Sequence, residues 1–85
     1  MLNIIIIIMK ENMEELLDVI ISKNLKNEIE QSGKSKTEIA KEIGVSKPTI
    51  SQYLSGKIQP SLSTFARLCN SLNCSADDIL NIKRK

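Results

Sequence analysis

The clearest hydrophobic pattern in this chain runs from Lys36 to Ser55. Its apolar residues recur three and four positions apart, as they do on one face of an α-helix. Gly44 interrupts the pattern, and glycine readily adopts the left-handed conformation in which many helices end. A turn of about three residues between two helices forces them to cross steeply. The sequence therefore predicts two short helices with the following residues on their inner faces: Ile39, Ala40, Ile43, Val45, Ile50, Tyr53 and Leu54.

Each of these helices has its own start signal. Ser35 stands three residues before Glu38, which is the spacing of a capping box and predicts that the first helix begins near Lys36. Ser46 can cap the second helix, and Pro48 lies in its first turn, where a missing backbone N–H costs nothing. The local signals agree with the hydrophobic pattern.

Apolar residues also recur at helical spacing between Lys10 and Ser32. The segment is either one long helix or two helices that break around Ser22 to Asn24, because serine and asparagine favour helix caps. Gly33 ends the helix in both cases. The apolar positions are Met13, Leu16, Leu17, Ile20, Ile21, Leu25 and Ile29.

The chain opens with MLNIIIIIM, which is too short for a bilayer span of about 20 apolar residues. A secretory signal is not expected, because no Lys or Arg precedes the isoleucines and no small-residue cleavage site follows them. β-Branched residues favour a strand, but a lone strand would be an exposed edge. Three interpretations remain: translation starts at Met9 or Met13, the run is a dimerisation segment, or it is an apolar cap folded on the domain.

Two further helices are predicted after the central pair. Gly56 and Pro60 mark a loop, and Ser61 can cap the helix that follows it. Ser75 and Asp78 form a box-like start for a short last helix carrying Ile79 and Leu80. The helix after Ser61 carries apolar residues at helical spacing: Leu62, Phe65, Leu68, Cys69 and Leu72.

Composition excludes several classes of protein. A chain of 85 residues forms one domain, with a core too small to enclose an ordinary catalytic cleft. The chain has no His, so the usual acid–base and metal-ligand sets are absent and an enzyme is not expected. Residues 1–33 carry three Lys against six acids (−3), and residues 34–85 carry nine basic residues against four acids (+5). A DNA backbone would be attracted to the second part.

The two cysteines do not indicate a metal site or a disulfide. A structural zinc ion needs four ligands, and Cys69 and Cys74 have no His to complete the set. Both occupy apolar positions in the C-terminal helical region, so we expect reduced thiols in the core and no cofactor.

The block SKTEIAKEIGVSKPTISQYLSGKIQPSL resembles the helix-turn-helix of the Cro and phage-repressor superfamily, often called XRE-type. The resemblance extends from about Ile21 to Ile82. It implies an all-α, compact five-helix lambda-repressor-like DNA-binding domain over residues 21–82, with an apolar helical extension at 1–20 and a basic tail at 83–85. It also implies a cytoplasmic, sequence-specific transcriptional regulator, expected to be a repressor that binds double-stranded DNA with a palindromic operator as a homodimer.

The resemblance assigns roles to individual residues. The second helix of the pair corresponds to the recognition helix, which lies in the major groove, and no carboxylate occurs between Ser46 and Lys57. Its base-contacting positions match Lys47, Pro48, Thr49, Ser51 and Gln52. The phosphate-contacting positions match Lys36, Ser46, Ser55 and Lys57.

The sequence departs from the family pattern at three positions. Many relatives pair an Arg with a Glu where this chain has Ile29 and Leu54, so any phosphate contact by that Arg is lost. Replacing a buried ion pair with apolar residues is often neutral or stabilising, and the fold is still expected. Lys34 replaces an apolar residue and is expected to add positive charge near the groove.

Two other functions remain open. An antitoxin or similar protein could use the same fold and bind a protein partner through residues 1–20. A helix-turn-helix module could also serve protein association alone, without affinity for DNA. No membrane partner is expected.

Overall fold

The computed structural model describes residues 2–82, and the side chains of all of these except residues 2, 3 and 7–11. The described residues form five helices and no strand, so the predicted all-α fold is confirmed for this part of the chain. The basic tail at 83–85 lies outside it. The helices are α1 (Leu2–Ser32), α2 (Lys36–Ile43), α3 (Lys47–Leu54), α4 (Leu62–Leu72) and α5 (Ala76–Leu80).

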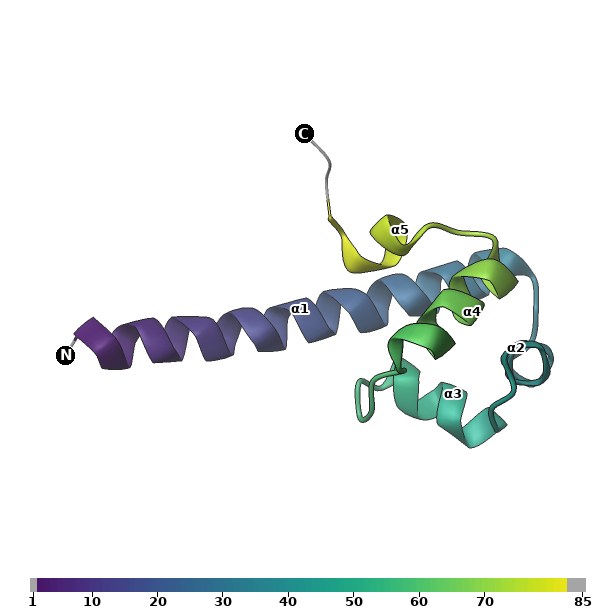
Figure 1. Ribbon diagram of the computed structural model, residues 1–85, viewed down its shortest axis with the longest axis horizontal. Coiled ribbons are helices and arrows are strands. Elements are labelled where there is room, and N and C mark those ends of the chain that lie inside the picture. Colours follow the sequence, from purple (N-terminus) through teal and green to yellow (C-terminus); the bar gives the residue numbers. More distant parts are fainter. Residues whose placement is uncertain (1, 83–85) are drawn as a thin grey trace.

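Helix α1 is one uninterrupted helix of 31 residues, so the alternative of a break around Ser22 to Asn24 is wrong. The side-chain amide of Asn24 donates a hydrogen bond to the Ile79 carbonyl (3.1 Å) and thereby joins α1 to α5. The N-terminal half of α1 projects beyond the other helices (Figure 1). Ile4, Ile5 and Ile6 are exposed there, so the interpretation of the isoleucines as a cap folded on the domain is also wrong.

Local capping fixes the limits of α2 and α3. The Ser35 hydroxyl accepts from the Glu38 backbone N–H (3.1 Å), but the Glu38 carboxylate lies 3.4 Å from that hydroxyl, so only the serine side of the predicted capping box forms. Gly44 ends α2 in the left-handed conformation (φ 76°), and its N–H donates to the Ala40 carbonyl. A complete capping box forms at α5, between its N-cap residue Ser75 and Asp78.

One apolar core joins all five helices. Helix α2 packs against α3 and α4, while the C-terminal half of α1 packs against α5, α3 and α4. Ile29 is buried in this core and Leu54 packs against it, which explains how the fold tolerates the missing Arg–Glu pair. The buried apolar residues are Leu25, Ile29, Ile39, Ala40, Ile43, Ile50, Tyr53, Leu68, Cys69, Leu72 and Ile79.

A polar contact between Lys34, Glu42 and Ser71 ties the corner after α1 to α2 and α4. The Lys34 ammonium lies 2.9 Å from the Glu42 carboxylate and donates to the Ser71 carbonyl (2.7 Å). The Ser71 hydroxyl bonds the same carboxylate, and these two partners, the hydroxyl first, lower the pKa of Glu42. The expectation that Lys34 adds positive charge near the groove is wrong, because Glu42 pairs with that charge.

Among the described residues, no helix has the length and apolar character that crossing a membrane requires.

Candidate nucleic-acid interface

Helix α3 separates its buried and exposed residues cleanly. Ile50 and Tyr53 are buried against the rest of the domain. On the opposite side of the helix, residues that recur one and four positions apart have exposed side chains. This exposed face carries four of the five predicted base-contacting residues: Lys47, Pro48, Ser51 and Gln52.

Thr49, the fifth predicted base-contacting residue, is half-buried and helps to cap α3. Its hydroxyl lies 2.8 Å from the Ser46 hydroxyl, and its backbone N–H donates to the same Ser46 oxygen (3.3 Å). Ser46 thus orders the N-terminus of α3, where free backbone N–H groups and the helix dipole favour an anion. Ser46 and Thr49 therefore fix the start of α3, and with it the position of the exposed residues on that helix.

The predicted phosphate-contacting residues flank α3 along the chain. Lys36 is exposed at the start of α2, the helix before α3, and Lys57 is exposed in the loop after α3. The Gln52 carbonyl accepts from the Ser55 hydroxyl (3.1 Å) and from the Lys57 backbone N–H (3.0 Å). The loop carrying Ser55 and Lys57 is therefore held against the last turn of α3.

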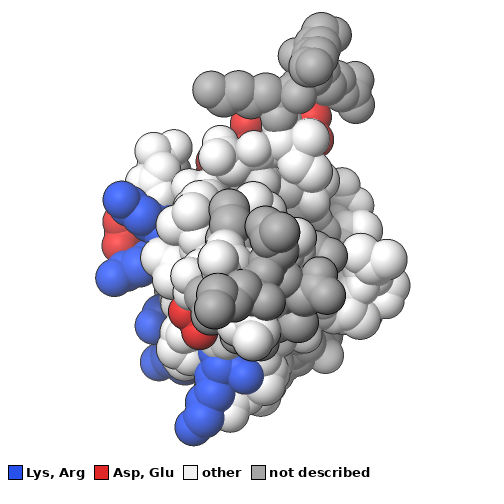
Figure 2. Space-filling view, turned by 90° about the vertical axis from the view of Figure 1, so that its left-hand side faces the viewer, with Lys and Arg blue, Asp and Glu red and all other residues white. Residues whose placement is uncertain are grey.

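The charge around this surface is of one sign over a long stretch. Residues 43–76 contain no Asp or Glu, and their charged residues are Lys47, Lys57 and Arg67. Seen from the N-terminal end of α1, Lys and Arg side chains gather along one side and the lower edge of the molecule, with a few acidic side chains between them (Figure 2). Such a one-sided distribution favours contact with a polyanion.

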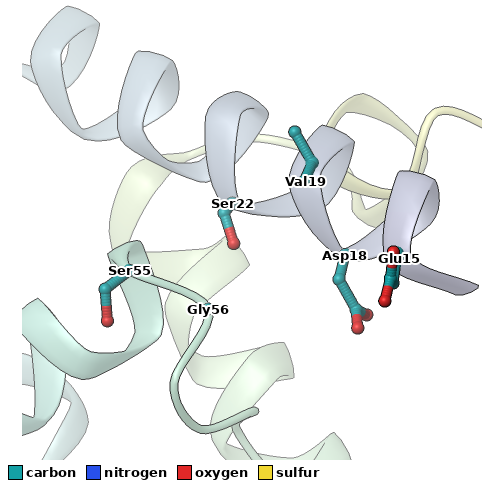
Figure 3. A pocket seen from close by; sticks show the side chains of 6 residues that line it. All are labelled: Glu15, Asp18, Val19, Ser22, Ser55 and Gly56. Carbon is teal, nitrogen blue, oxygen red and sulfur yellow. The ribbon is translucent and has the colours of Figure 1, made fainter.

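Two carboxylates lie beside this surface, in an open cleft between α1 and the turn after α3. The cleft is lined by Glu15, Asp18, Val19, Ser22, Ser55 and Gly56. The Glu15, Asp18 and Ser55 side chains point toward the same side of it (Figure 3). Gly56 has φ +75°, and a Cβ there would stand 3.2 Å from the Ser22 hydroxyl, so the turn closely approaches α1.

Sequence reasoning missed these two acids, because the fold alone brings them close to Ser55. Asp18 lies within 3.5 Å of Gln59, 41 positions away in the chain. No local pattern indicates such a contact.

We expect the double substitution Glu15→Gln and Asp18→Asn to raise affinity for duplex DNA about 2- to 10-fold at low salt, because it removes two negative charges near Ser55, a predicted phosphate-contacting residue. Fluorescence anisotropy over a salt series measures this, and the gain should disappear at high salt. Asp18→Glu keeps the charge and is the matched control. Equal affinities of the double variant and the wild type at low salt would place the DNA backbone away from the cleft.

The two cysteines occupy the core positions that the sequence predicts and are free thiols. Burial raises the pKa of Cys69, and it raises the pKa of Cys74 to about 12. Both thiols are therefore protonated at neutral pH, and a protonated thiol is a poor nucleophile and metal ligand. No group of three or more His, Cys, Asp or Glu side chains suited to a metal ion occurs in the described part of the chain.

A family model described as helix-turn-helix matches residues 25–79. The matched region runs from the C-terminal half of α1 through α2, α3 and α4 into α5, and it includes every predicted DNA-contacting residue. Comparison with curated proteins and with solved structures gives no match. Since the family match covers more than half of the chain and coincides with the crossed pair α2 and α3, the protein belongs to the helix-turn-helix family of the XRE type, a family of DNA-binding regulators.

Proposed function

We propose that this protein is a cytoplasmic transcriptional repressor that binds a palindromic operator as a homodimer. The observation that carries the proposal is the exposed face of α3, which has hydrogen-bonding side chains and no carboxylate while its opposite side is buried in the core. A helix presented in this way can enter the major groove, which is wide enough to admit it.

Lys47 and Gln52 provide most of the direct base discrimination in this proposal. A lysine ammonium donates to guanine O6 and N7, and a glutamine amide bonds adenine N6 and N7 through both of its polar atoms. Ser51 lies beside them on the exposed face and can bond either kind of base edge. Pro48 offers only van der Waals contact, such as with a thymine methyl group. Thr49 acts mainly through its contact with Ser46.

Lys36, Ser46, Ser55 and Lys57 position the domain on the DNA backbone. Contacts to phosphates determine affinity and its salt dependence, but they carry no base preference of their own. Lys36 begins the helix before α3 and Lys57 lies in the loop after it, so in this proposal the two contact separate stretches of the DNA backbone.

We expect Lys36→Ala or Lys57→Ala to weaken binding to all sequences alike. Each change removes one phosphate contact, so the slope of log affinity against log salt should flatten by about one. Binding isotherms on a preferred and a shuffled duplex, at several salt concentrations, measure both quantities. A change in base preference on either substitution would contradict the assigned role.

A dimer is proposed because one domain of this size reads too few base pairs to select a unique site. Two half-sites about one helical turn, or 34 to 36 Å, apart would suit a symmetric pair of recognition helices.

Selection from random duplex DNA tests the proposed function as a whole. We expect a palindromic consensus to be enriched, and a reporter with that site over its promoter to lose expression when the protein is present. Enrichment without a consensus, or no enrichment, would contradict sequence-specific binding. A rise in reporter expression would contradict repression.

One observation favours a second candidate, an antitoxin or similar protein that binds another protein. The N-terminal half of α1 exposes apolar side chains, including Met13 and Leu16, that a partner could cover. Co-purification of a stoichiometric partner with the wild type, but not with a Leu16→Glu variant, would support this candidate.

A further inference from the structure

The N-terminal half of α1 has a broad apolar face that its own domain does not cover. Figure 1 shows this segment projecting from the bundle. Before Ile20 its described side chains are exposed, although Asp18 reaches Gln59 of the domain (3.5 Å), whereas Ile20 and Ile21 are half-buried. An apolar face of this extent in water usually marks an interaction site. Its described apolar residues and their exposed fractions are Ile5 54%, Ile6 46%, Met13 63%, Leu16 59%, Leu17 44% and Val19 64%.

Residues on this face recur with the alternating spacing of four and three that helices use when they pair. The residues at this spacing, here called the seam, are Leu2, Ile6, Met9, Met13, Leu16 and Ile20. The next two positions of the same repeat are Lys23 and Asn27, which are polar. The seam therefore stops where α1 begins to pack against its own domain.

Acidic residues avoid the seam and the positions beside it. Numbered by the same repeat, Glu11, Glu14, Glu15 and Asp18 all fall at the three outer positions, and Lys10 is the one charged residue at a flanking position. Glu14, Glu15 and Asp18 are exposed. Two such helices could pair along their seams without bringing carboxylates together. Carboxylates at seam or flanking positions would repel one another and oppose pairing.

We propose that residues 2–20 of α1 pair along the seam with the same segment of a second copy of this chain. The inference deepens the proposed function, because it assigns the contact that would hold two recognition helices in one dimer.

The available apolar area fits such a partner. A large apolar side chain presents about 60 to 120 Å² of apolar surface, so the six exposed apolar residues described on this face would supply about 350 to 700 Å² per protomer. The upper part of this range reaches about 600 Å² per partner, the area at which stable protein interfaces begin. A lipid surface is a poorer partner, because the helices that lie on membranes carry Lys and Arg on their polar face and this polar face is acidic.

The full chain, free of DNA, tests the inference through its oligomeric state. Met13 and Ile4 are almost equally exposed (63% and 62%), but Met13 lies in the seam and Ile4 lies at an outer position. We expect the wild type to be a dimer by light scattering and sedimentation equilibrium at micromolar concentrations. Met13→Glu should raise the dimer dissociation constant at least about 100-fold, because it places a carboxylate in an apolar contact, whereas Ile4→Glu should raise it less than about 3-fold. Leu16→Glu should act as Met13→Glu does.

Circular dichroism verifies that the variants keep their helices, which is expected because none of the three side chains is buried within one copy. A monomeric wild type would overturn the inference, as would a Met13→Glu variant that dimerises like the wild type. Equal weakening by Ile4→Glu would show unspecific apolar association and also overturn it. A monomer that binds anionic vesicles would identify a membrane as the partner instead.

These outcomes are separate from failure of the proposed function. A monomer that still selects a DNA sequence would overturn only the proposed pairing along the seam and the proposed dimer. A seam dimer that selects no DNA sequence would overturn only the proposed function as a repressor.

Discussion

Replacing Leu68 by alanine is expected to lower the free energy of unfolding by about 2 to 5 kcal/mol, the usual cost of deleting most of a buried leucine side chain. Leu68 is 0% exposed and lies on α4, which packs against α2 and α1. Its removal would leave a cavity between these helices. Because a domain of this kind is stable by only about 5 to 15 kcal/mol in total, this loss is a large share of its stability.

Urea unfolding followed by circular dichroism measures this effect. Leu62→Ala is the matched control, because Leu62 begins the same helix and is 87% exposed. The control should change the free energy of unfolding by less than about 0.5 kcal/mol. Similar values for the two variants would contradict the packing of α4 on the core.

Gln52→Ala and Lys47→Ala are each expected to cost about 1 to 3 kcal/mol of binding to the preferred operator, a loss of about 5- to 150-fold in affinity. Each side chain is exposed on α3 and can reach a base edge when the helix enters the major groove. The loss should be confined to one base position in each half-site. At that position the preference should relax toward all four bases, while the other positions keep theirs.

Repeating the selection with each variant, followed by binding isotherms on the recovered duplexes, measures both parts of this prediction. Gln31→Ala makes the same chemical change at an exposed site on α1, outside α3, and should leave affinity and preference unchanged. Stability should be unaffected by all three changes, because none of these side chains is buried. A uniform loss over all sequences on Gln52→Ala would show that Gln52 contacts the backbone instead.

The sequence predicted α2 and α3 well, because their limits depend on interactions within four residues. Ser35 and Ser46 bond the backbone N–H groups three positions later, and Gly44 adopts the left-handed conformation that ends α2. The burial of Ile50 and Tyr53 and the exposure of Gln52 follow from the helical repeat. The exposed face of the candidate site could therefore be predicted without the structure.

Interactions between residues far apart in the sequence were harder to predict. The Lys34 charge looked free in the sequence, but Glu42 and Ser71 reach it only after α2 and α4 have packed together. The cap at Thr49 reduces the role expected of that residue at a base edge, since its hydroxyl already has a partner.

The sequence alone determined the class of fold, the crossed pair of helices and the polarity of the exposed face of α3, because hydrophobic spacing and caps act locally. Only the tertiary structure decided that α1 continues through Asn24, that its apolar N-terminal half is left uncovered, and that Glu15 and Asp18 stand beside Ser55. These features depend on how segments more than 30 residues apart pack against one another, and neither helical spacing nor capping encodes that packing.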